Sequence, residues 1–237
     1  MKARAPLAAL VDAASAPYRC VDRFAYYHAR GKFNADPAFE GMLRGGWLAQ
    51  ARTVLDLGCG QGLLASWLLS AGSPGIRGEW PVDWPPPPRP EAIRGIEMRE
   101  QAVRRARDAL GERAEFLQGD IAHTGFGAAD AVIIMDVLHY IDYRAQETIL
   151  ERVHAALAVG GVLIVREADA AAGIRFLIGK CVDATVVLAQ QLRAPRLYFR
   201  SASEWLSLLK TSGFNTETVP MSAGTPFANV MLIARRQ

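Results

Sequence analysis

The stretch Val54-Leu55-Asp56-Leu57-Gly58-Cys59-Gly60-Gln61-Gly62 is the most informative part of this 237-residue chain. Apolar residues surround one acid, three glycines follow at every second position, and the apolar run 63–69 comes next. The pattern predicts a buried strand, a tight turn and then a helix. Because glycine lacks a Cβ atom and a helix N-terminus has free N–H groups, such a turn can press against a ligand. We therefore expect a ligand site here, the alternative being a turn without a ligand.

Composition describes a globular domain with a substantial core. Hydrophobic residues make up 51% of the chain and charged residues 22%. The net charge of +3 comes from dispersed basic residues, which is not the basic stripe of a nucleic-acid binder. Cys20, Cys59 and Cys181 are odd in number and far apart, so neither a disulfide framework nor a bound metal is expected. A reducing, cytoplasmic location fits this cysteine usage.

The distribution of apolar residues bears on membrane association. The N-terminus lacks the sustained apolar core of a signal peptide. The longest apolar stretch, Ile174 to Leu192, includes Arg175, Lys180 and Asp183, which excludes an ordinary membrane span. We expect a core or lid helix there, with peripheral membrane contact as the alternative.

Periodicity and turn residues predict alternating strands and helices. Residues 17–50 are expected to be helical, with Asp36-Pro37 as an N-cap followed by Pro at the first helical position. Seven prolines in 73–91 exclude helix and central strand, which suggests an insertion. The remaining elements are expected as follows: strands over 92–97, 115–121, 129–140 and 162–165, helices over 98–110, from Asp142 to Gly160-Gly161 and over 203–210, and a closing hairpin of 216–221 with 229–234.

Acidic residues end several of these strands. Glu97 closes the second strand, and a carboxylate there can bind the two ribose hydroxyls of an adenosine cofactor. In such cofactor sites this acid usually stands about 20 residues after the glycine turn. The interval to Glu97 is longer, and it agrees with the usual one if 73–91 is an insertion. Glu97 as a plain surface acid, and Asp120 as a turn cap, are the alternatives.

The acid followed by Gly-Cys-Gly-Gln-Gly resembles the first motif of the class I S-adenosylmethionine-dependent methyltransferases. Glu97, Asp120-Ile121 and Asp136 fall where later motifs of that family stand, and Ser-Glu-Trp-Leu-Ser-Leu-Leu-Lys resembles the last helix of its small-molecule members. The resemblance covers about 50–165. It implies a Rossmann-like α/β fold with a seven-stranded, mostly parallel sheet, helices on both faces and an antiparallel last strand.

The resemblance also implies S-adenosyl-L-methionine as the cofactor, and it implies a role for each residue that would bind this cofactor. Asp56 would lie near the ammonium group, Glu97 would bind the ribose, Asp120 and Ile121 would contact the adenine, and Asp136 would border the sulfonium. The full set expected to bind the cofactor is Asp56, Gly58, Cys59, Gly60, Gly62, Glu97, Met98, Asp120, Ile121, Asp136 and Val137.

A hydroxyl acceptor needs its proton removed, and two histidines are candidates for that base. His139 stands three residues after Asp136, and a structural role for it is an equal alternative. His28, among the N-terminal aromatics, is the second candidate. The acceptor pocket is expected to be formed by 18–45, the loop after His139 and 168–200. The residues of these segments suit a small apolar or aromatic acceptor, free or bound to a carrier. O-methylation is the favoured reaction. The segment 24–39 and the core are faintly similar to methyltransferases of bacterial polyketide and aryl-polyene pathways, which suggests secondary metabolism.

The expected organisation is a single domain: a helical cap (1–50), a cofactor core with the 73–91 insertion (51–167), a substrate lid (168–200), and a last helix with a closing hairpin (201–237). Two other functions stay open. One is a protein that binds S-adenosylmethionine without methylating, acting as a partner of another enzyme. The other is a dinucleotide-dependent oxidoreductase, although the third glycine lacks the spacing that this class uses. The oligomeric state is not predicted.

Overall fold

The computed structural model describes residues 4–73, 76, 78, 80–177 and 196–237. Its centre is a sheet whose seven described strands run in the order β3-β2-β1-β4-β5-β7-β6. Every pairing is parallel except those that β7 makes with β5 and β6. The strands are β1 Thr53–Leu57, β2 Ala92–Glu97, β3 Glu115–Gln118, β4 Ala129–Met135, β5 Leu157–Ala168, β6 Phe214–Pro220 and β7 Asn229–Arg236. The predicted sheet with one antiparallel strand is confirmed.

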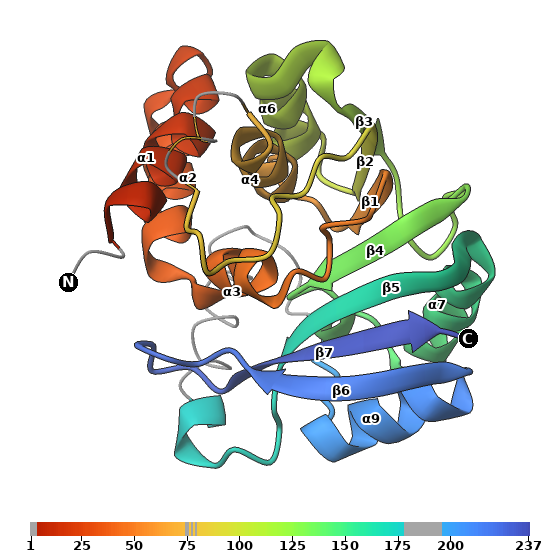
Figure 1. The fold of residues 1–237 in the computed structure, drawn as a ribbon. Coiled ribbons are helices and arrows are strands. Elements are labelled where there is room, and N and C mark those ends of the chain that lie inside the picture. The colour runs from red at the N-terminus through yellow and green to blue at the C-terminus, as the bar shows by residue number, and fades with distance from the viewer. Residues whose placement is uncertain (1–3, 74–75, 77, 79, 178–195) are drawn as a thin grey trace.

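Helices cover both faces of the sheet (Figure 1). Alternate residues of each strand face opposite sides: Val54 and Ile133 belong to one hydrophobic cluster, whereas Leu55 and Ile134 belong to another. The first cluster lies under α1, α2, α3, α4 and α6, and the second lies under α7 and α9. These helices are α1 Arg4–Ser15, α2 Arg23–Ala35, α3 Pro37–Gly45, α4 Leu63–Ala71, α6 Glu100–Leu110, α7 Tyr143–Ala156 and α9 Ala202–Thr211.

The N-terminal helices form a cap on one end of the sheet. Asp36 ends α2 and begins α3, where its side chain accepts a hydrogen bond from the Ala38 N–H and Pro37 takes the first helical position. This confirms the helix N-cap that Asp36-Pro37 predicted. Helix α1 packs against α4 and lies within the helical cap expected over 1–50, although the helical pattern itself was recognised only from residue 17.

Several boundaries were predicted wrongly. The third strand was expected to reach Ile121 and the fourth to reach Tyr140, but β3 ends at Gln118, β4 ends at Met135, and Leu138–Tyr140 form a 3-10 helix. The helix after Asp142 was expected to continue to Gly160-Gly161, but α7 ends at Ala156 and Leu157 already begins β5. Gly160 has φ +77, and a Cβ on Gly161 would lie 2.9 Å from the Asp130 carbonyl oxygen. The two glycines therefore serve a close approach within the irregular start of β5 rather than a helix end.

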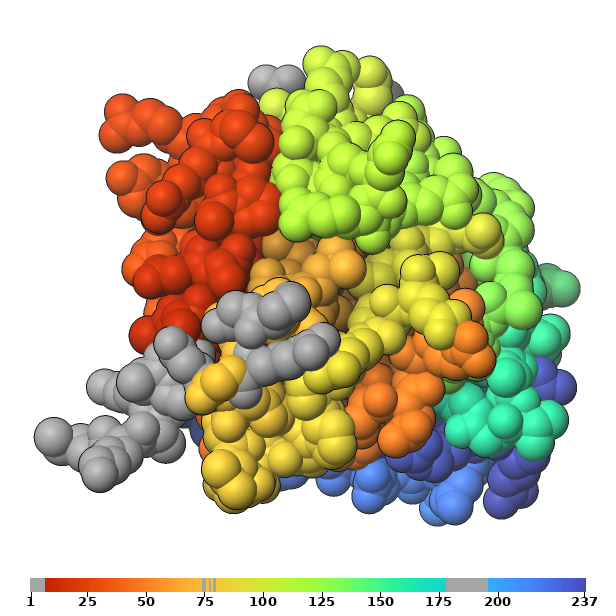
Figure 2. All heavy atoms as spheres, turned by 45° about the horizontal axis from the view of Figure 1, so that its top comes forward, coloured from red at the N-terminus to blue at the C-terminus, as the bar shows by residue number. Residues whose placement is uncertain are grey.

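The proline-rich segment lies on the surface, in yellow in Figure 2. Its described residues 80–91 include neither helix nor strand, as predicted, whereas Ile76 is helical, contrary to the prediction for 73–91. Trp80 contacts Trp84 edge to face, and its indole N–H donates to the Pro85 carbonyl at 2.9 Å. Both tryptophans also pack against the hydrophobic core, so this segment is docked.

Much of the expected lid lies outside the described residues. The structure describes 169–177 and 196–200, but 178–195 fall outside it, and so do Cys181 and most of the apolar stretch 174–192. Among the helices that the structure describes, none is both long enough and apolar enough to cross a membrane.

Candidate functional site

The glycine turn follows β1 and leads into α4. Gly58, Gly60 and Gly62 all have positive φ, at +78°, +54° and +78°. A Cβ on Gly58 would lie 2.2 Å from a methyl carbon of Val137, and one on Gly62 would lie 2.8 Å from the Phe116 ring. At Gly60 no atom lies within 4 Å of such a Cβ. Two glycines are therefore needed for packing, whereas Gly60 leaves the backbone open to a ligand.

Two buried carboxyl groups lie beside this turn. Glu97 accepts a hydrogen bond from the Gly60 N–H at 3.0 Å and another from the Arg99 N–H at 2.9 Å. Burial, together with the nearby Glu97 charge, raises the pKa of Asp56 to about 7. A cation bound at Asp56 would offset both effects. The open Gly60 backbone and this acid fit a ligand with an ammonium group, such as S-adenosylmethionine.

Two cavities open at the carboxyl ends of the strands. The first, here named the turn cavity, has a volume of about 250 Å³ and borders the glycine turn. The second, the cap cavity, has a volume of about 440 Å³ and lies between α2, the ends of β4 and β5, and the loop before β7. Residues that line the turn cavity include Asp56, Gly58, Cys59, Gly60, Gln61, Leu64 and Met135. Residues that line the cap cavity include Tyr27, Gly31, Ala35, Pro37, His139, Ala168, Thr225, Phe227 and Asn229.

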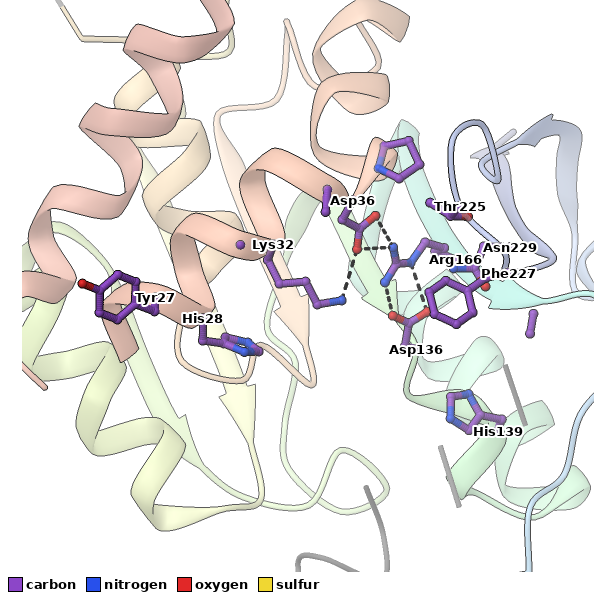
Figure 3. A pocket seen from close by; sticks show the side chains of 14 residues that line it. Tyr27, His28, Lys32, Asp36, Asp136, His139, Arg166, Thr225, Phe227 and Asn229 are labelled. Atoms are coloured by element: carbon purple, nitrogen blue, oxygen red, sulfur yellow. Dashed lines mark hydrogen bonds and ion pairs between the residues drawn. The ribbon is translucent and has the colours of Figure 1, made fainter. Parts of the chain in front are cut away.

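Five residues line both cavities: His28, Lys32, Asp36, Asp136 and Arg166. We call them the boundary cluster. Four of these side chains point toward one another in Figure 3. The Arg166 guanidinium contacts both Asp36 carboxylate oxygens at 2.5 Å and also pairs with Asp136, from Nε to Oδ1 at 3.0 Å. Lys32 Nζ lies 3.1 Å from Asp36 Oδ2.

Asp136 has an unusual backbone. Among the described residues it is the only one other than glycine with a positive φ, at +56°. Such a conformation costs about 1 kcal/mol or more, so the surroundings must impose it. The Asp136 N–H donates to the Arg166 carbonyl at 3.0 Å, while the Arg166 guanidinium holds the side chain. Arg166, with 3% of its side chain exposed, thus fixes Asp136 from both ends.

The two candidate histidines occupy different surroundings. His139 lines the cap cavity but is buried, and its Nδ1 lies 2.7 Å from a carboxylate oxygen of Glu167. Glu167 also accepts the Leu138 N–H at 2.8 Å, and Phe199 stacks on the His139 ring at 4.9 Å. His139 Nε2 has almost no solvent exposure. These contacts are typical of a residue that stabilises the turn after β4.

His28 lies on α2, on the boundary between the cavities, with part of its ring open to solvent. Its ring stacks on Phe24 at 5.6 Å. Burial lowers the pKa of His28, and the positive charges of Lys32, Arg105 and Arg99 lower it further. His28 is therefore neutral at pH 7 and able to accept a proton.

Of the other predicted cofactor residues, Cys59 lines the turn cavity, whereas Met98, Asp120 and Ile121 do not. Cys59 is buried against Gly95, and Ile121 is buried, while Met98 is 66% exposed. Asp120 Oδ1 accepts the Ala122 N–H at 2.8 Å, which is the turn-cap role that the sequence left open. The adenine and ribose contacts of these residues stay predictions.

Sequence reasoning missed two site residues, Lys32 and Glu167, and assigned Asp36 only as a helix cap. Lys32 stands four residues before Asp36 on α2, a spacing that predicts an ion pair. No local signal pairs Asp36 with Arg166, which is 130 residues away. Among the residues that the structure describes, no cluster of three His, Cys, Asp or Glu side chains could hold a metal ion.

The strand order, the glycine turn after β1 and the cavities at the strand ends define a class I methyltransferase fold. Residues 55–163 match the family model described as "Methyltransferase domain". The carboxy-S-adenosyl-L-methionine synthase of Chromohalobacter salexigens is 30% identical over 119 residues, which cover 48% of this chain and 39% of that protein. This region is therefore similar to S-adenosylmethionine-dependent methyltransferases, which confirms the resemblance, the enzyme class and the cofactor that the motifs predicted.

Solved structures agree on the fold. Human N-acetylserotonin methyltransferase in complex with S-adenosylmethionine has a TM-score of 0.62 and 19% identity, covering 88% of this chain and 53% of its own. The mitomycin 7-O-methyltransferase has a TM-score of 0.62 and 22% identity, covering 89% of this chain and 56% of its own. The chain thus spans about two fifths to a little over half the length of these proteins.

Proposed function

We propose that this protein transfers a methyl group from S-adenosylmethionine to a hydroxyl oxygen of a small aromatic or apolar acceptor. The observation that carries the proposal is the boundary cluster between the two cavities. A group that passes from a cofactor in the turn cavity to an acceptor in the cap cavity must cross the cluster. Two similar structures carry the names of methyltransferases that act on small molecules, N-acetylserotonin and mitomycin.

The turn cavity is the place for the cofactor. Its open Gly60 backbone can lie against the methionine part, and ionised Asp56 can pair with the ammonium group. S-adenosylmethionine supplies the methyl group in activated form, on a sulfonium. Because displacement at that methyl group is in-line, the chain contributes chiefly by holding both partners at the right distance and angle.

The cap cavity is the place for the acceptor. Tyr27, Ala35, Pro37 and Phe227 give it apolar walls, which suit a ring, and the side chain of Asn229 can hydrogen-bond to a polar substituent. A volume of about 440 Å³ lies in the range of pockets for small molecules.

His28 is the base in this proposal. Its position in both cavities places the imidazole at the boundary, and its lowered pKa keeps it neutral. As the acceptor oxygen takes the methyl group, its proton passes to the free imidazole nitrogen of His28. His139 is buried and bound to Glu167, so we assign it a structural role.

Calorimetric titration with S-adenosylmethionine, S-adenosylhomocysteine and NAD tests the cofactor side. We expect micromolar binding of the two adenosyl ligands and its loss in Asp56→Ala and Glu97→Ala. NAD binding, or no binding of any of the three, would contradict the proposal and favour the oxidoreductase or the inactive partner.

A panel of phenols and hydroxylated polycyclic aromatics, with radiolabelled S-adenosylmethionine as methyl donor, tests the transfer. On any acceptor that is methylated, His28→Ala should lower kcat by about a hundredfold or more, with cofactor affinity unchanged. The control is His123→Ala, since His123 is exposed and lines neither cavity. Full activity of His28→Ala would remove His28 as the base. Cofactor binding without methylation of any acceptor would favour an inactive binding protein.

A further inference from the structure

Two buried hydrogen bonds join the N-terminal cap to the glycine turn, and both involve Gln61. The Tyr18 hydroxyl, in the short 3-10 helix Ala16–Cys20, donates to the Gln61 carbonyl at 3.0 Å. The Gln61 side-chain amide donates to the Ala25 carbonyl at 3.0 Å, in the first turn of α2. Burial raises the pKa of Tyr18, so its hydroxyl keeps the proton that it donates. Gln61 is therefore held by two different parts of the cap.

Gln61 stands where the backbone of the turn is least constrained by its own sequence. Gly60 and Gly62 flank it, and a glycine on each side leaves the intervening peptide planes free to rotate. Gln61 is buried and lines the turn cavity, directly after the Gly60 backbone that is open to a ligand. The bond from Tyr18 gives the buried Gln61 carbonyl a partner and so fixes the plane of the peptide that follows it.

The side chain of Gln61 holds one end of the helix that carries His28. Helix α2 is bound to the turn at its beginning, through Ala25, and to Arg166 at its end, through Asp36. His28 lies three residues after Ala25, which is about 4.5 Å along the helix axis, whereas Asp36 lies about 12 Å further on. The end that Gln61 holds is thus the nearer one to the imidazole.

Other contacts at this end of α2 fix its position less exactly. Asp22 caps the helix and pairs with Arg105 at 2.9 Å, but the Asp22 side chain is 39% exposed, and exposed ion pairs contribute little. Ala25, Ala29 and Phe33 pack the helix against the core. Packing of this kind is non-directional, whereas a hydrogen bond determines which atoms face each other.

We propose that Gln61 is a positioning residue that aligns the His28 imidazole with the cofactor, and that Tyr18 holds Gln61 in place. The backbone of Gln61 belongs to the turn on which the cofactor lies, and its side chain holds the helix that carries the base. A single residue thus sets the distance between the methyl donor and the base, and transfer depends on such alignment. This inference rests on the proposed function, because it needs His28 as the base and the turn as the cofactor site.

The pKa of His28 reports where its imidazole lies. Burial and the charges of Lys32, Arg105 and Arg99 hold this pKa below its ordinary value. The other charged groups of the boundary cluster pair with one another, namely Asp36, Asp136 and Arg166. If α2 moves away from the turn, water reaches the ring, and the pKa of His28 rises.

Nuclear magnetic resonance of the imidazoles measures this pKa and needs no acceptor. The chain has four histidines, so the spectrum is simple, and His28→Ala assigns the signal. Gln61→Met keeps the size of the side chain but removes the amide that holds α2. We expect the pKa of His28 to rise toward its ordinary value of 6.5 in this variant. The signal of the exposed His123 should titrate as in the wild type.

A double-mutant cycle tests the same link on any acceptor that is methylated. Gln61→Met alone should lower kcat about tenfold, with the Kd for S-adenosylmethionine within about threefold of wild type. In the His28→Ala background the same substitution should leave kcat unchanged, because a base that is absent cannot be misplaced. Tyr18→Phe removes one oxygen atom and should raise the Kd about fivefold, since the peptide after Gln61 is no longer fixed.

Gln146→Met is the matched control. Gln146 is a buried glutamine whose side-chain amide also donates to backbone carbonyls, but it belongs to α7 and lines neither cavity. This variant should lower the Tm and leave the pKa of His28 unchanged. Gln61→Leu is a second test of the same amide and should reproduce the effects of Gln61→Met. Thermal unfolding of each variant verifies that it is folded.

The outcomes separate the role of Gln61 from the proposed function. An unchanged pKa of His28 in folded Gln61→Met overturns the inference and leaves the function intact. A pKa that rises equally in Gln146→Met does the same, and so does a kcat that Gln61→Met lowers equally with and without His28, because both would show general damage to the structure. Full activity of His28→Ala overturns His28 as the base and the inference with it.

Discussion

The glycine turn and the boundary cluster are neighbouring parts of one site, but they are built in different ways. The turn is one continuous stretch, 54–62, and steric limits on three glycines fix its shape. In the boundary cluster, ion pairs join Lys32, Asp36, Asp136 and Arg166, which come from distant parts of the chain, and His28 lines the same two cavities. The cofactor side is thus encoded locally, whereas the acceptor side depends on the complete fold.

Replacing Gly58 would disrupt the glycine turn most strongly. Gly58→Ala adds a Cβ that collides with Val137, besides the cost of about 1 kcal/mol for positive φ. Thermal unfolding should show a severe loss of stability, and titration should show no cofactor binding.

Gly60→Ala is the matched variant, since its Cβ meets no atom within 4 Å. It should stay folded, with a cost limited to about 1 kcal/mol, and yet lose cofactor affinity. Cofactor binding by Gly60→Ala at wild-type affinity would show that the open backbone is not the ligand surface.

Asp56 provides a test of electrostatics within the turn. Its pKa of about 7 in the folded state lies above the value of 3.8 that an aspartate has in an unfolded chain. The folded state therefore binds more protons between these values, and stability falls as pH rises from about 4 to about 7. The total change is on the order of 4 kcal/mol. Urea unfolding at several pH values should show this decrease, and Asp56→Asn should remove it.

The same carboxyl group makes cofactor binding depend on pH. An ammonium group beside Asp56 favours its ionised form, so binding at pH 6 should release a proton and affinity should rise up to about pH 7. Calorimetry in two buffers with different ionisation enthalpies measures this release. Proton-neutral binding at pH 6 would place the ammonium group elsewhere.

On the acceptor side, variants of His139 and His28 distinguish a structural role from a catalytic one. His139→Ala leaves the buried Glu167 carboxylate without its imidazole contact, which should cost about 3 kcal/mol of unfolding free energy. The variant should lower the Tm, whereas His28→Ala should lower kcat with little change in Tm. His123→Ala is again the control. A Tm equal to that of wild type would argue against a structural role for His139.

Gly31 is expected to give the smallest effect. It lies within α2, faces the cap cavity, and has no atom within 4 Å of an added Cβ. Gly31→Ala should therefore stabilise the protein by about 1 kcal/mol through helix propensity. Cofactor affinity should stay unchanged, as the turn cavity does not include this residue. Weaker cofactor binding would show that the two cavities are less separate than their linings indicate.

What could be predicted from the sequence follows the same division between the glycine turn and the boundary cluster. The strand, turn and helix around Gly58 and the acid at Glu97 were predicted, because apolar periodicity and glycine spacing are local signals. The Asp36 cap was also predicted, because Asp-Pro marks a helix start. Its pairing with Arg166 could not be, since no local pattern joins residues so far apart. Likewise the choice between His28 and His139 needed burial and neighbours, which the sequence does not contain.

The contact between Asp36 and Arg166 also has a consequence for the synthesis and folding of the chain. It spans 130 residues, so it forms only after a long chain segment has been ordered. At a synthesis rate of about 5–20 residues per second, the ribosome adds the intervening residues in roughly ten seconds. During that interval the chain gains the residues of the glycine turn and Glu97, while Asp36 still lacks its partner. The residues of the cofactor side are therefore all made before the boundary cluster can be completed.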